Sequence, residues 1–310
     1  MPCFDREYYE KRSDSGDQDA MPMAIVISCH EPVESVLFQT ITRLSRDKLV
    51  RVYVIDSSPD SKAEHIRKFI SSLTKELPEK KINYFHVKSL GLAYKENFGI
   101  KKACDDNAQI IMLIDDDVYI LDAFDAKEII RFFCSMCGPL DLLVFPGNEE
   151  QLRSIGGRRL KVWGDSCFAF SKRLCPKARI REDLVIDQTD VEFSKRVVRN
   201  GGKICAYPFL IRKSLPIGRV KESKVVLPSW RIYLFTRNVL ALSLEERNLT
   251  DFLWSLWSIV ILSVNNINYY HRPLLTLHAV ARGILDALAR NMGVTPVLQK
   301  LSGNAFDNET

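Results

Sequence analysis

The sequence lacks the short glycine-rich motifs with which many proteins hold phosphate groups. Neither a P-loop nor the dinucleotide-binding pattern G-x-G-x-x-G occurs in its 310 residues. Internal repeats are also missing, and the only low-complexity stretch is the polar start of the chain. These absences argue against a repeat architecture, and any nucleotide must be held in another way.

A long uninterrupted apolar run is missing as well. The densest run, Phe252–Val264, is 13 residues long. That is shorter than the roughly 20 residues a membrane-spanning helix needs. Two tryptophans in the run and the flanking Arg247 and Arg272 are typical of a helix that lies at a membrane surface. A buried core helix explains the same run equally well, so both interpretations stay open.

The eight cysteines show no spacing typical of a disulfide framework, and no secretory signal precedes them. This pattern predicts a reducing, cytoplasmic compartment. Cys134 and Cys137 form a C-x-x-C pair without a second pair at zinc spacing, which disfavours a metal or redox site. Cys29 and His30 adjoin at the end of an expected strand, so their side chains point to opposite faces and the pair is interpreted as structural.

The composition, 46% hydrophobic and 27% charged residues, is that of an ordinary globular protein. Its charge is unevenly distributed. Residues 151–224 hold 18 Lys and Arg against 7 Asp and Glu, whereas the whole chain has a net charge of +5. This basic block predicts an anionic partner. Aromatic residues are sparse within it, so the phosphates of a nucleotide or of a lipid carrier fit better than a nucleic acid does.

Apolar strand patterns alternate with helical patterns in the first half of the chain. Strands are expected at 23–28, 50–55, 82–87 and 110–114, with helices at 32–45, 62–77 and from Gly91 or later to about 105. This alternation predicts βαβ units and a mostly parallel sheet. Further strands are expected at 142–145, 167–171 and 204–211, with a helix at 191–200 that ends at Gly201-Gly202. We expect a disordered tail at 1–22, an α/β domain at 23–228 and a helical region at 229–310.

Three consecutive aspartates, Asp115, Asp116 and Asp117, follow the apolar run Ile110–Ile114 directly. Neighbouring carboxylates repel one another unless a cation or hydrogen-bond donors compensate them. In open α/β sheets the carboxyl end of a strand is where ligands bind. Hard oxygen ligands at that place suit Mg2+ or Mn2+ bridging to a diphosphate. An isolated aspartate triplet is more often a solvated turn, so the interpretation depends on the other segments.

Several other segments in the correct order and spacing make a resemblance to a known family. They are V-I-S-C-H at 26–30, V-I-D-S-S-P-D at 54–60, S-L-G-L-A-Y-K-E-N-F-G-I at 89–100, D-Q-T-D-V-E-F-S-K-R at 187–196 and R-I-Y-L-F-T-R-N at 231–238. With the aspartate triplet they resemble glycosyltransferase family 2, and more narrowly its rhamnosyltransferase-like members. The similarity covers about residues 23–293. It implies a GT-A fold, that is, a mostly parallel central sheet flanked by helices, here with a C-terminal helical extension.

The resemblance also implies roles for individual residues. Asp190 matches the general base, and Asp115 and Asp117 match the metal ligands. The residues implied in binding the nucleotide sugar are Ser28, His30, Asp56, Ser57, Gly91, Ala93, Asn97, Asp115 and Asp116. Those implied at an acceptor or diphosphate are Trp163, Arg231, Arg237 and Asn238. The chain departs from the family pattern at Leu90, where a polar residue is usual, and at Thr189, where Glu is commoner.

Structural alternatives exist for several of these residues. Asp56 precedes Ser-Ser-Pro and is typical of a turn-forming aspartate. Glu192 and Arg196 have the spacing of a salt bridge along a helix surface. Arg231, Arg237 and Asn238 also fit the solvated face of an amphipathic helix.

The resemblance implies an inverting, metal-dependent transfer of a hexosyl or deoxyhexosyl group, rhamnosyl-like, from a nucleotide-diphosphate sugar. The implied acceptor is a glycan or lipid-linked saccharide. The implied setting is polysaccharide biosynthesis for the cell envelope, at the inner face of the cell membrane, with an anionic membrane surface as a further partner. A nucleotidyltransferase is one alternative, although residues 29–32, C-H-E-P, offer no phosphate loop after the first strand. The other is a non-catalytic carbohydrate- or partner-binding protein on the same scaffold, which the intact Asp115, Asp117 and Asp190 disfavour.

Overall fold

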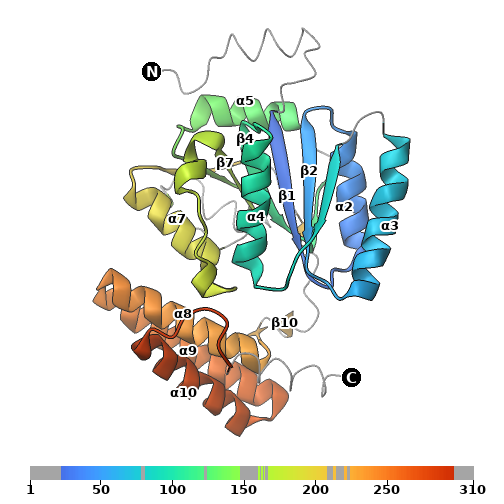
Figure 1. The fold of residues 1–310 in the computed structure, drawn as a ribbon. Coiled ribbons are helices and arrows are strands. Elements are labelled where there is room, and N and C mark those ends of the chain that lie inside the picture. The colour runs from blue at the N-terminus through green and yellow to red at the C-terminus, as the bar shows by residue number, and fades with distance from the viewer. Residues whose placement is uncertain are drawn as a thin grey trace. The chain divides into compact units, whose positions relative to one another are not determined.

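The computed structural model describes residues 22–77, 81–121, 124–146, 160, 162, 164, 167–207, 212–213, 220–221 and 224–296. The chain divides into two compact units (Figure 1). The sheet unit comprises Met1–Ile180 and Phe193–Ser214, and the helical unit comprises Arg181–Glu192 and Leu215–Thr310. Residues 181–192, which the sequence places within the α/β region, thus pack with the helical unit.

The sheet unit is built around a seven-stranded sheet with the order β3-β2-β1-β4-β7-β6-β8. The four strands β3, β2, β1 and β4 are parallel, whereas β7 runs antiparallel to both β4 and β6. The expected strands are therefore present, although β8 is shorter than expected and spans Ile204–Ala206. Their bounds are β1 Met23–Cys29, β2 Val50–Asp56, β3 Ile82–His86, β4 Ile110–Asp115, β6 Leu142–Val144, β7 Phe168–Ser171 and β8 Ile204–Ala206.

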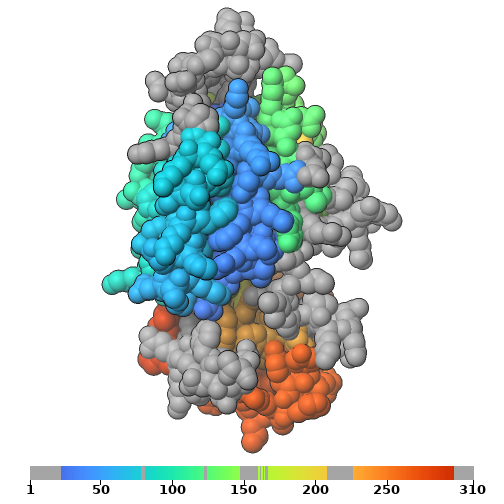
Figure 2. Space-filling view, turned by 90° about the vertical axis from the view of Figure 1, so that its right-hand side faces the viewer, coloured from blue at the N-terminus to red at the C-terminus, as the bar shows by residue number. Residues whose placement is uncertain are grey.

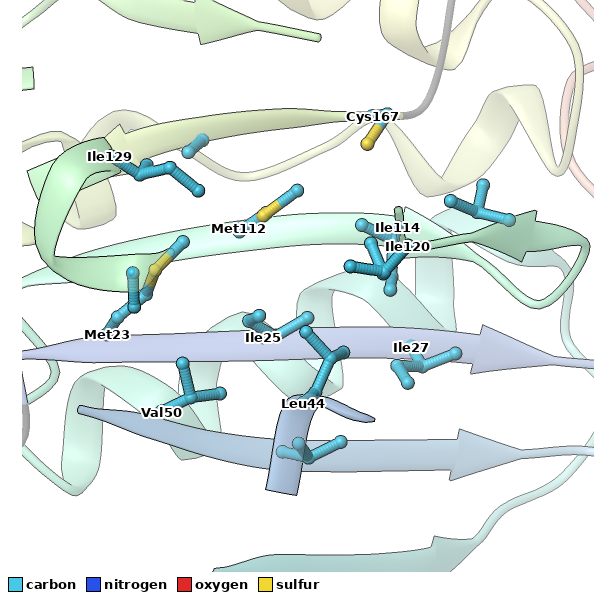
Figure 3. Close-up of a cluster of buried hydrophobic side chains, with 14 of the residues drawn as sticks. Met23, Ile25, Ile27, Leu44, Val50, Met112, Ile114, Ile120, Ile129 and Cys167 are labelled. Atoms are coloured by element: carbon cyan, nitrogen blue, oxygen red, sulfur yellow. The ribbon is translucent and has the colours of Figure 1, made fainter. Parts of the chain in front are cut away.

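Helices cover both faces of this sheet, because the central strands are apolar on both sides. In β1, Met23, Ile25 and Ile27 point to a core shared with α2, α3 and α5, part of which Figure 3 shows. The alternating Ala24 and Val26 point to a second core, shared with α4 and with the part of α7 that belongs to this unit. The helix bounds are α2 Glu34–Arg46, α3 Asp60–Glu76, α4 Leu92–Asp105, α5 Ala126–Met136 and α7 Thr189–Arg199.

Smaller elements complete the sheet unit, and the sequence did not predict them. The two-residue strands β5 (Val118–Tyr119) and β9 (Arg212–Lys213) pair antiparallel. The 3₁₀ helix η1 spans Lys172–Lys177. Its Cys175 is joined by a disulfide to Cys104 of α4, across 71 residues of sequence, a pairing that the cysteine spacing did not indicate and that is unusual for the expected reducing compartment.

The helical unit consists mainly of three helices, α8 Ser229–Glu246, α9 Leu249–Tyr270 and α10 Pro273–Ala289. It also holds the 3₁₀ helix η2 (Glu182–Leu184) and the short hairpin of β10 (Val220–Lys221) and β11 (Lys224–Val225). Both α9 and α10 pack against α8, which is buried along most of its length. Gly283 lets α10 approach α8 closely, since a Cβ there would lie 2.8 Å from the Tyr233 carbonyl oxygen.

The apolar helix α9 is buried on one side only. Ser255, Ile259, Leu262 and Asn266 are buried, whereas Trp254 and Trp257 are 67% and 57% exposed. The interpretation of this run as a wholly buried core helix is therefore wrong. Within the described part of the chain, none of the helices combines the length and hydrophobicity that crossing a bilayer requires.

Candidate functional site

The carboxyl ends of β1, β2 and β4 lie side by side at one edge of the sheet. The parallel register pairs Ser28 of β1 with Asp115 of β4, and Cys29 of β1 with Asp56 of β2. Because the strands are parallel and adjacent, the segments that follow them emerge at the same edge. The structure thus brings together six of the residues that the resemblance implies for the nucleotide sugar, Ser28, His30, Asp56, Ser57, Asp115 and Asp116, with Asp117, which it implies for the metal.

Asp116, which follows β4, contacts the segment that follows β1. Its Oδ2 accepts a hydrogen bond of 2.9 Å from the backbone N–H of His30. Burial raises the pKa of Asp116 to about 7, and the charges of Asp115 and Asp117 add to this, while the His30 N–H and Lys95 oppose it. A cation placed here would stabilise the ionised carboxylates.

The carboxylates at this edge fit a divalent cation that is also bound by the phosphates of a substrate. Among the residues that the structure describes, no group of three or more His, Cys, Asp or Glu is arranged to hold a metal ion alone. Mg2+ is commonly held by only one or two carboxylates together with substrate phosphates and water. Asp115, at the end of β4, and Asp117, just after it, supply two such carboxylates.

Ser28 provides a second sign that this edge binds a ligand. The residue is only 5% exposed, and its hydroxyl has no hydrogen-bond partner among the described residues. Leaving a buried polar group unpaired costs about 1–3 kcal/mol. Ser28 pairs in register with Asp115. A buried hydroxyl without a partner next to the aspartate triplet needs an explanation, and a bound molecule at this edge would supply one.

Asp56 and Ser57 are held by contacts within the protein. Asp56 is fully buried; its Oδ1 accepts the backbone N–H of Ser58 at 2.8 Å, and its Oδ2 accepts the Tyr84 hydroxyl at 2.7 Å. The Ser57 hydroxyl donates to the Cys29 carbonyl at 3.3 Å and lies 3.3 Å from His30 Nδ1. The turn-forming role of Asp56 is thus visible, and its contact with a nucleotide base stays a prediction.

The segment at 89–100 comprises the residues just before α4 and the first part of that helix. Gly91 has a φ of 102°, a value that favours glycine, and precedes the helix directly. Ala93 is fully buried. The Asn97 side chain bonds the backbone N–H and carbonyl of Ile180, both at 2.8 Å. Asn97 therefore fixes the chain at Ile180, and the contacts of these three residues with a nucleotide sugar stay predictions.

A buried lysine at this edge was not predicted. Lys95 is 5% exposed, and its Nζ donates to the carbonyl of Cys29 at 2.7 Å. Burial lowers the pKa of Lys95, while the neighbouring Cys29, Asp116, Glu96 and Asp56 oppose that shift. A signal in the sequence could have located Lys95. Gly99 follows it by four residues, so the two lie on the same face of the helix, the face toward the sheet.

Cys29 has no features of a nucleophile. It is fully buried, and burial raises the pKa of its thiol well above the usual value, with Asp116 and Asp56 adding to the effect. A protonated, inaccessible thiol is unreactive. This agrees with the structural interpretation of the Cys29–His30 pair.

Asp190, the expected general base, belongs to the helical unit and lies in the first turn of α7. It is half-buried, and its Oδ1 accepts the backbone N–H of Val191 at 2.8 Å. The residues before it are in an unusual conformation: Val185, Asp187 and Gln188 have φ values of 67°, 60° and 67°. Such backbone costs about 1–3 kcal/mol per residue and persists only where the surroundings enforce it.

Two fully buried residues of α8 hold this strained loop. Asn238 Nδ2 lies 2.8, 2.8 and 3.0 Å from the carbonyl oxygens of Leu184, Ile186 and Asp187. The Arg237 guanidinium donates to the carbonyl of Gly293 at 2.6 Å and to that of Asp183 at 3.2 Å.

Arg231, nearly two helical turns earlier, forms a two-point ion pair with the Asp187 carboxylate. It is 8% exposed, whereas Arg237 and Asn238 are 0% exposed. The interpretation of these three residues as a solvated helix face is therefore wrong, because α8 is enclosed by its own unit. Their polar groups serve the loop that precedes Asp190.

The remaining predicted residues are placed as follows. The Arg196 guanidinium donates to the carbonyls of Lys177 and Arg179 at 2.8 and 2.7 Å. Glu192 is buried. Trp163 lies outside the described residues.

Comparisons with known proteins establish the fold. A scan against protein-family models gave no match, and neither did a search of curated proteins. The mannosyltransferase PcManGT from Pyrobaculum calidifontis, solved in complex with GDP-Man and Mn2+, matches with a TM-score of 0.55 at 14% identity, over 93% of this chain and 81% of that one. Residues 1–349 of TarS from S. aureus match with a TM-score of 0.51 at 14% identity, over 86% and 81%. At this identity the similarity shows the fold alone, which is the expected GT-A fold with a C-terminal helical region.

Proposed function

We propose that the protein is a glycosyltransferase that moves a hexosyl or deoxyhexosyl group, rhamnosyl-like, from a nucleotide-diphosphate sugar to a glycan or lipid-linked saccharide. The observation that carries the proposal is the aspartate triplet at the carboxyl end of β4, in register with the unpaired buried hydroxyl of Ser28. The complex of PcManGT with GDP-Man and Mn2+ supports this class of donor on the same fold.

On the donor side, Asp115 and Asp117 would hold Mg2+ or Mn2+. When bound, the cation neutralises charge that gathers on the departing diphosphate. The other groups are already positioned by the protein, since the His30 N–H holds Asp116 and Lys95 holds the carbonyl of Cys29. We assign contacts with the nucleotide sugar to residues at this edge and at the start of α4, namely Ser28, His30, Asp56, Ser57, Gly91, Ala93, Asn97, Asp115 and Asp116.

On the acceptor side, we assign Asp190 as the general base that takes the proton of the incoming hydroxyl. The strained segment before it, held by Asn238, Arg237 and Arg231, supports a functional role, because backbone strain clusters at active sites. The hydroxyl attacks the anomeric carbon from the side opposite the diphosphate, so a single displacement inverts the configuration.

We further propose membership of glycosyltransferase family 2, in the rhamnosyltransferase-like subgroup whose motifs residues 187–196 and 231–238 resemble. As a member of this subgroup, the enzyme would act in polysaccharide biosynthesis for the cell envelope. It would be cytoplasmic and peripheral on the inner face of the cell membrane, where a lipid-linked acceptor is available.

A screen of nucleotide sugars with Mn2+ by thermal shift tests the donor class. A ligand that binds only the folded state raises the melting temperature by mass action. The best donor is then tested for release of nucleoside diphosphate with and without saccharide acceptors. Binding without release would favour the non-catalytic alternative, and release of pyrophosphate from a nucleoside triphosphate would favour the nucleotidyltransferase.

A further inference from the structure

The outer face of α9 is apolar along most of the helix. From 251 to 267 every exposed residue is apolar, namely Leu253, Trp254, Leu256, Trp257, Val260, Ile261 and Val264. In Figure 2 atoms of α9, in orange, form part of the visible surface. Large contiguous apolar patches are rare on monomeric proteins and mark interaction sites.

The neighbouring helix α10 continues this surface. Leu274, Leu277, Leu285 and Leu288 are 82%, 54%, 54% and 64% exposed and recur at helical spacing. The helices α9 and α10 contact each other, and both pack against α8. Their outer faces therefore point away from the same inner helix and form one surface, which we call the α9–α10 face.

Exposed positive charge borders this face. From Arg247 to Arg290 the chain holds four arginines and two aspartates, and Glu245, just before this stretch, is ion-paired with Arg181. Of the aspartates, Asp286 is buried and accepts the Tyr233 hydroxyl at 2.7 Å. Arg247, Arg272 and Arg290 are exposed and adjoin the ends of the three helices, outside the apolar stripe.

We propose that the α9–α10 face docks on a bilayer that contains anionic lipid, with both helices lying in the plane of the membrane. Aromatic and aliphatic side chains enter the boundary between headgroups and acyl chains, and the bordering arginines meet lipid phosphates. This proposal names the surface by which the protein would contact the membrane. It rests on the proposed function in one respect, that sugar transfer takes place at the membrane.

The packing of α9 favours a helix on the membrane over one across it. Its inner face is tied to the unit, since Asn266 Oδ1 accepts the backbone N–H of Leu227 at 3.0 Å and its amide donates to the Leu227 carbonyl. A second copy of the chain fits less well as the occupant. Protein interfaces carry about one hydrogen bond per 100–200 Å². Among the exposed residues of α9 from 251 to 267, only the indole N–H groups of Trp254 and Trp257 could form such bonds across an interface.

Vesicle flotation of the full chain at low salt tests the proposal. We compare vesicles of phosphatidylcholine alone with vesicles of phosphatidylcholine and phosphatidylglycerol, without donor. The wild type should float with the anionic vesicles, with a blue shift of tryptophan fluorescence. The double variant Trp254→Ser/Trp257→Ser should lose about tenfold or more in partitioning, because it removes the two largest inserted side chains. The double variant Arg247→Gln/Arg272→Gln should lose about fivefold per arginine on anionic vesicles only.

Two further variants keep the result interpretable. Leu274→Ser/Leu277→Ser changes α10 in place of α9 and should also weaken flotation. Met136→Ser, at a 62% exposed apolar position on α5 in the sheet unit, should leave it unchanged. Unchanged circular dichroism and melting temperature confirm that these surface variants fold.

Failure of the wild type to float with anionic vesicles would overturn the proposal, as would tryptophan variants that float as well as the wild type. Light scattering of the free protein gives the remaining outcome: a dimer that Trp254→Ser/Trp257→Ser separates, with no vesicle binding, would assign the face to a second copy. Donor binding is measured without lipid, so the proposed function and the membrane contact can fail independently.

Discussion

The loop that precedes Asp190 allows a quantitative test of how this protein positions its expected base. Asn238 offers two amide hydrogens to three backbone carbonyls, those of Leu184, Ile186 and Asp187, at 2.8–3.0 Å. The substitution Asn238→Leu keeps a side chain of similar size but removes both donors. It therefore removes a donor from the part-buried carbonyls of Ile186 and Asp187, whereas the Leu184 carbonyl keeps the Ile186 N–H at 2.8 Å.

The expected cost follows from these contacts. A hydrogen bond contributes about 0.5–1.5 kcal/mol net, and each buried carbonyl left unpaired costs about 1–3 kcal/mol. Relaxation of the left-handed residues Val185, Asp187 and Gln188 returns part of this, since each costs about 1–3 kcal/mol. We expect Asn238→Leu to lower the free energy of unfolding by about 2–4 kcal/mol. The relaxed loop no longer presents Asp190, so transfer should also fall while donor affinity is kept.

Urea denaturation, donor titration and initial rates of transfer measure these three effects on one preparation. Asn238→Asp is a second test variant, because it keeps the shape of the side chain but places a carboxylate oxygen against the backbone carbonyls. It should lower the free energy of unfolding at least as much as Asn238→Leu does. Asn268→Leu, at an exposed position of α9, is the matched control and should change stability by less than about 0.5 kcal/mol. The reasoning is wrong if Asn238→Leu unfolds like the wild type, or if donor affinity falls as much as transfer does.

Three other substitutions test separate parts of the proposal. Asp117→Asn should abolish metal-dependent binding of nucleoside diphosphate in calorimetric titrations while the fold is kept; titrations that are identical with and without chelator would count against the metal site. Asp190→Asn should lower the transfer rate by about 10²–10⁴-fold with nearly unchanged nucleotide affinity; near-normal turnover here, with loss in Glu192→Gln, would move the base to Glu192. Gly283→Ala places a Cβ 2.8 Å from the Tyr233 carbonyl and should destabilise the helical unit by about 1–3 kcal/mol in thermal melts. The exposed Ala281→Ser serves as its control, and an equal melting temperature for both variants would refute the close approach of α8 and α10.

Much of the fold could be predicted because its signals are local. A strand buried on both faces needs a continuous apolar run between turns, as at 23–28 and 110–114, and such a run is visible without its neighbours. The same holds for the aspartate triplet, since parallel strands place whatever follows them at one edge of the sheet. The antiparallel insertion of β7 between β4 and β6 could not be predicted, because strand order depends on pairing between distant segments.

The candidate site divides in the same way. Ser28, Asp56 and Asp115–Asp117 could be located from their strands alone. Lys95 was missed because a charged residue in a helix is by default expected in solvent, and only the packing of α4 under β1 encloses it. Arg237 and Asn238 were misjudged because their partners are backbone carbonyls more than 50 residues away, which no pattern in the sequence identifies.

The strands of the sheet, the helices that follow them and the carboxylates at the end of β4 could all be predicted, because each depends on residues that are adjacent along the chain. Which polar side chains are buried and which apolar ones are exposed follows from the packing of the folded protein. In α9 apolar residues occur on all sides, so periodicity could not distinguish the face packed on α8 from the face that carries Trp254 and Trp257. That choice depends on which neighbours cover the helix, and those neighbours are set by the packing of the whole unit.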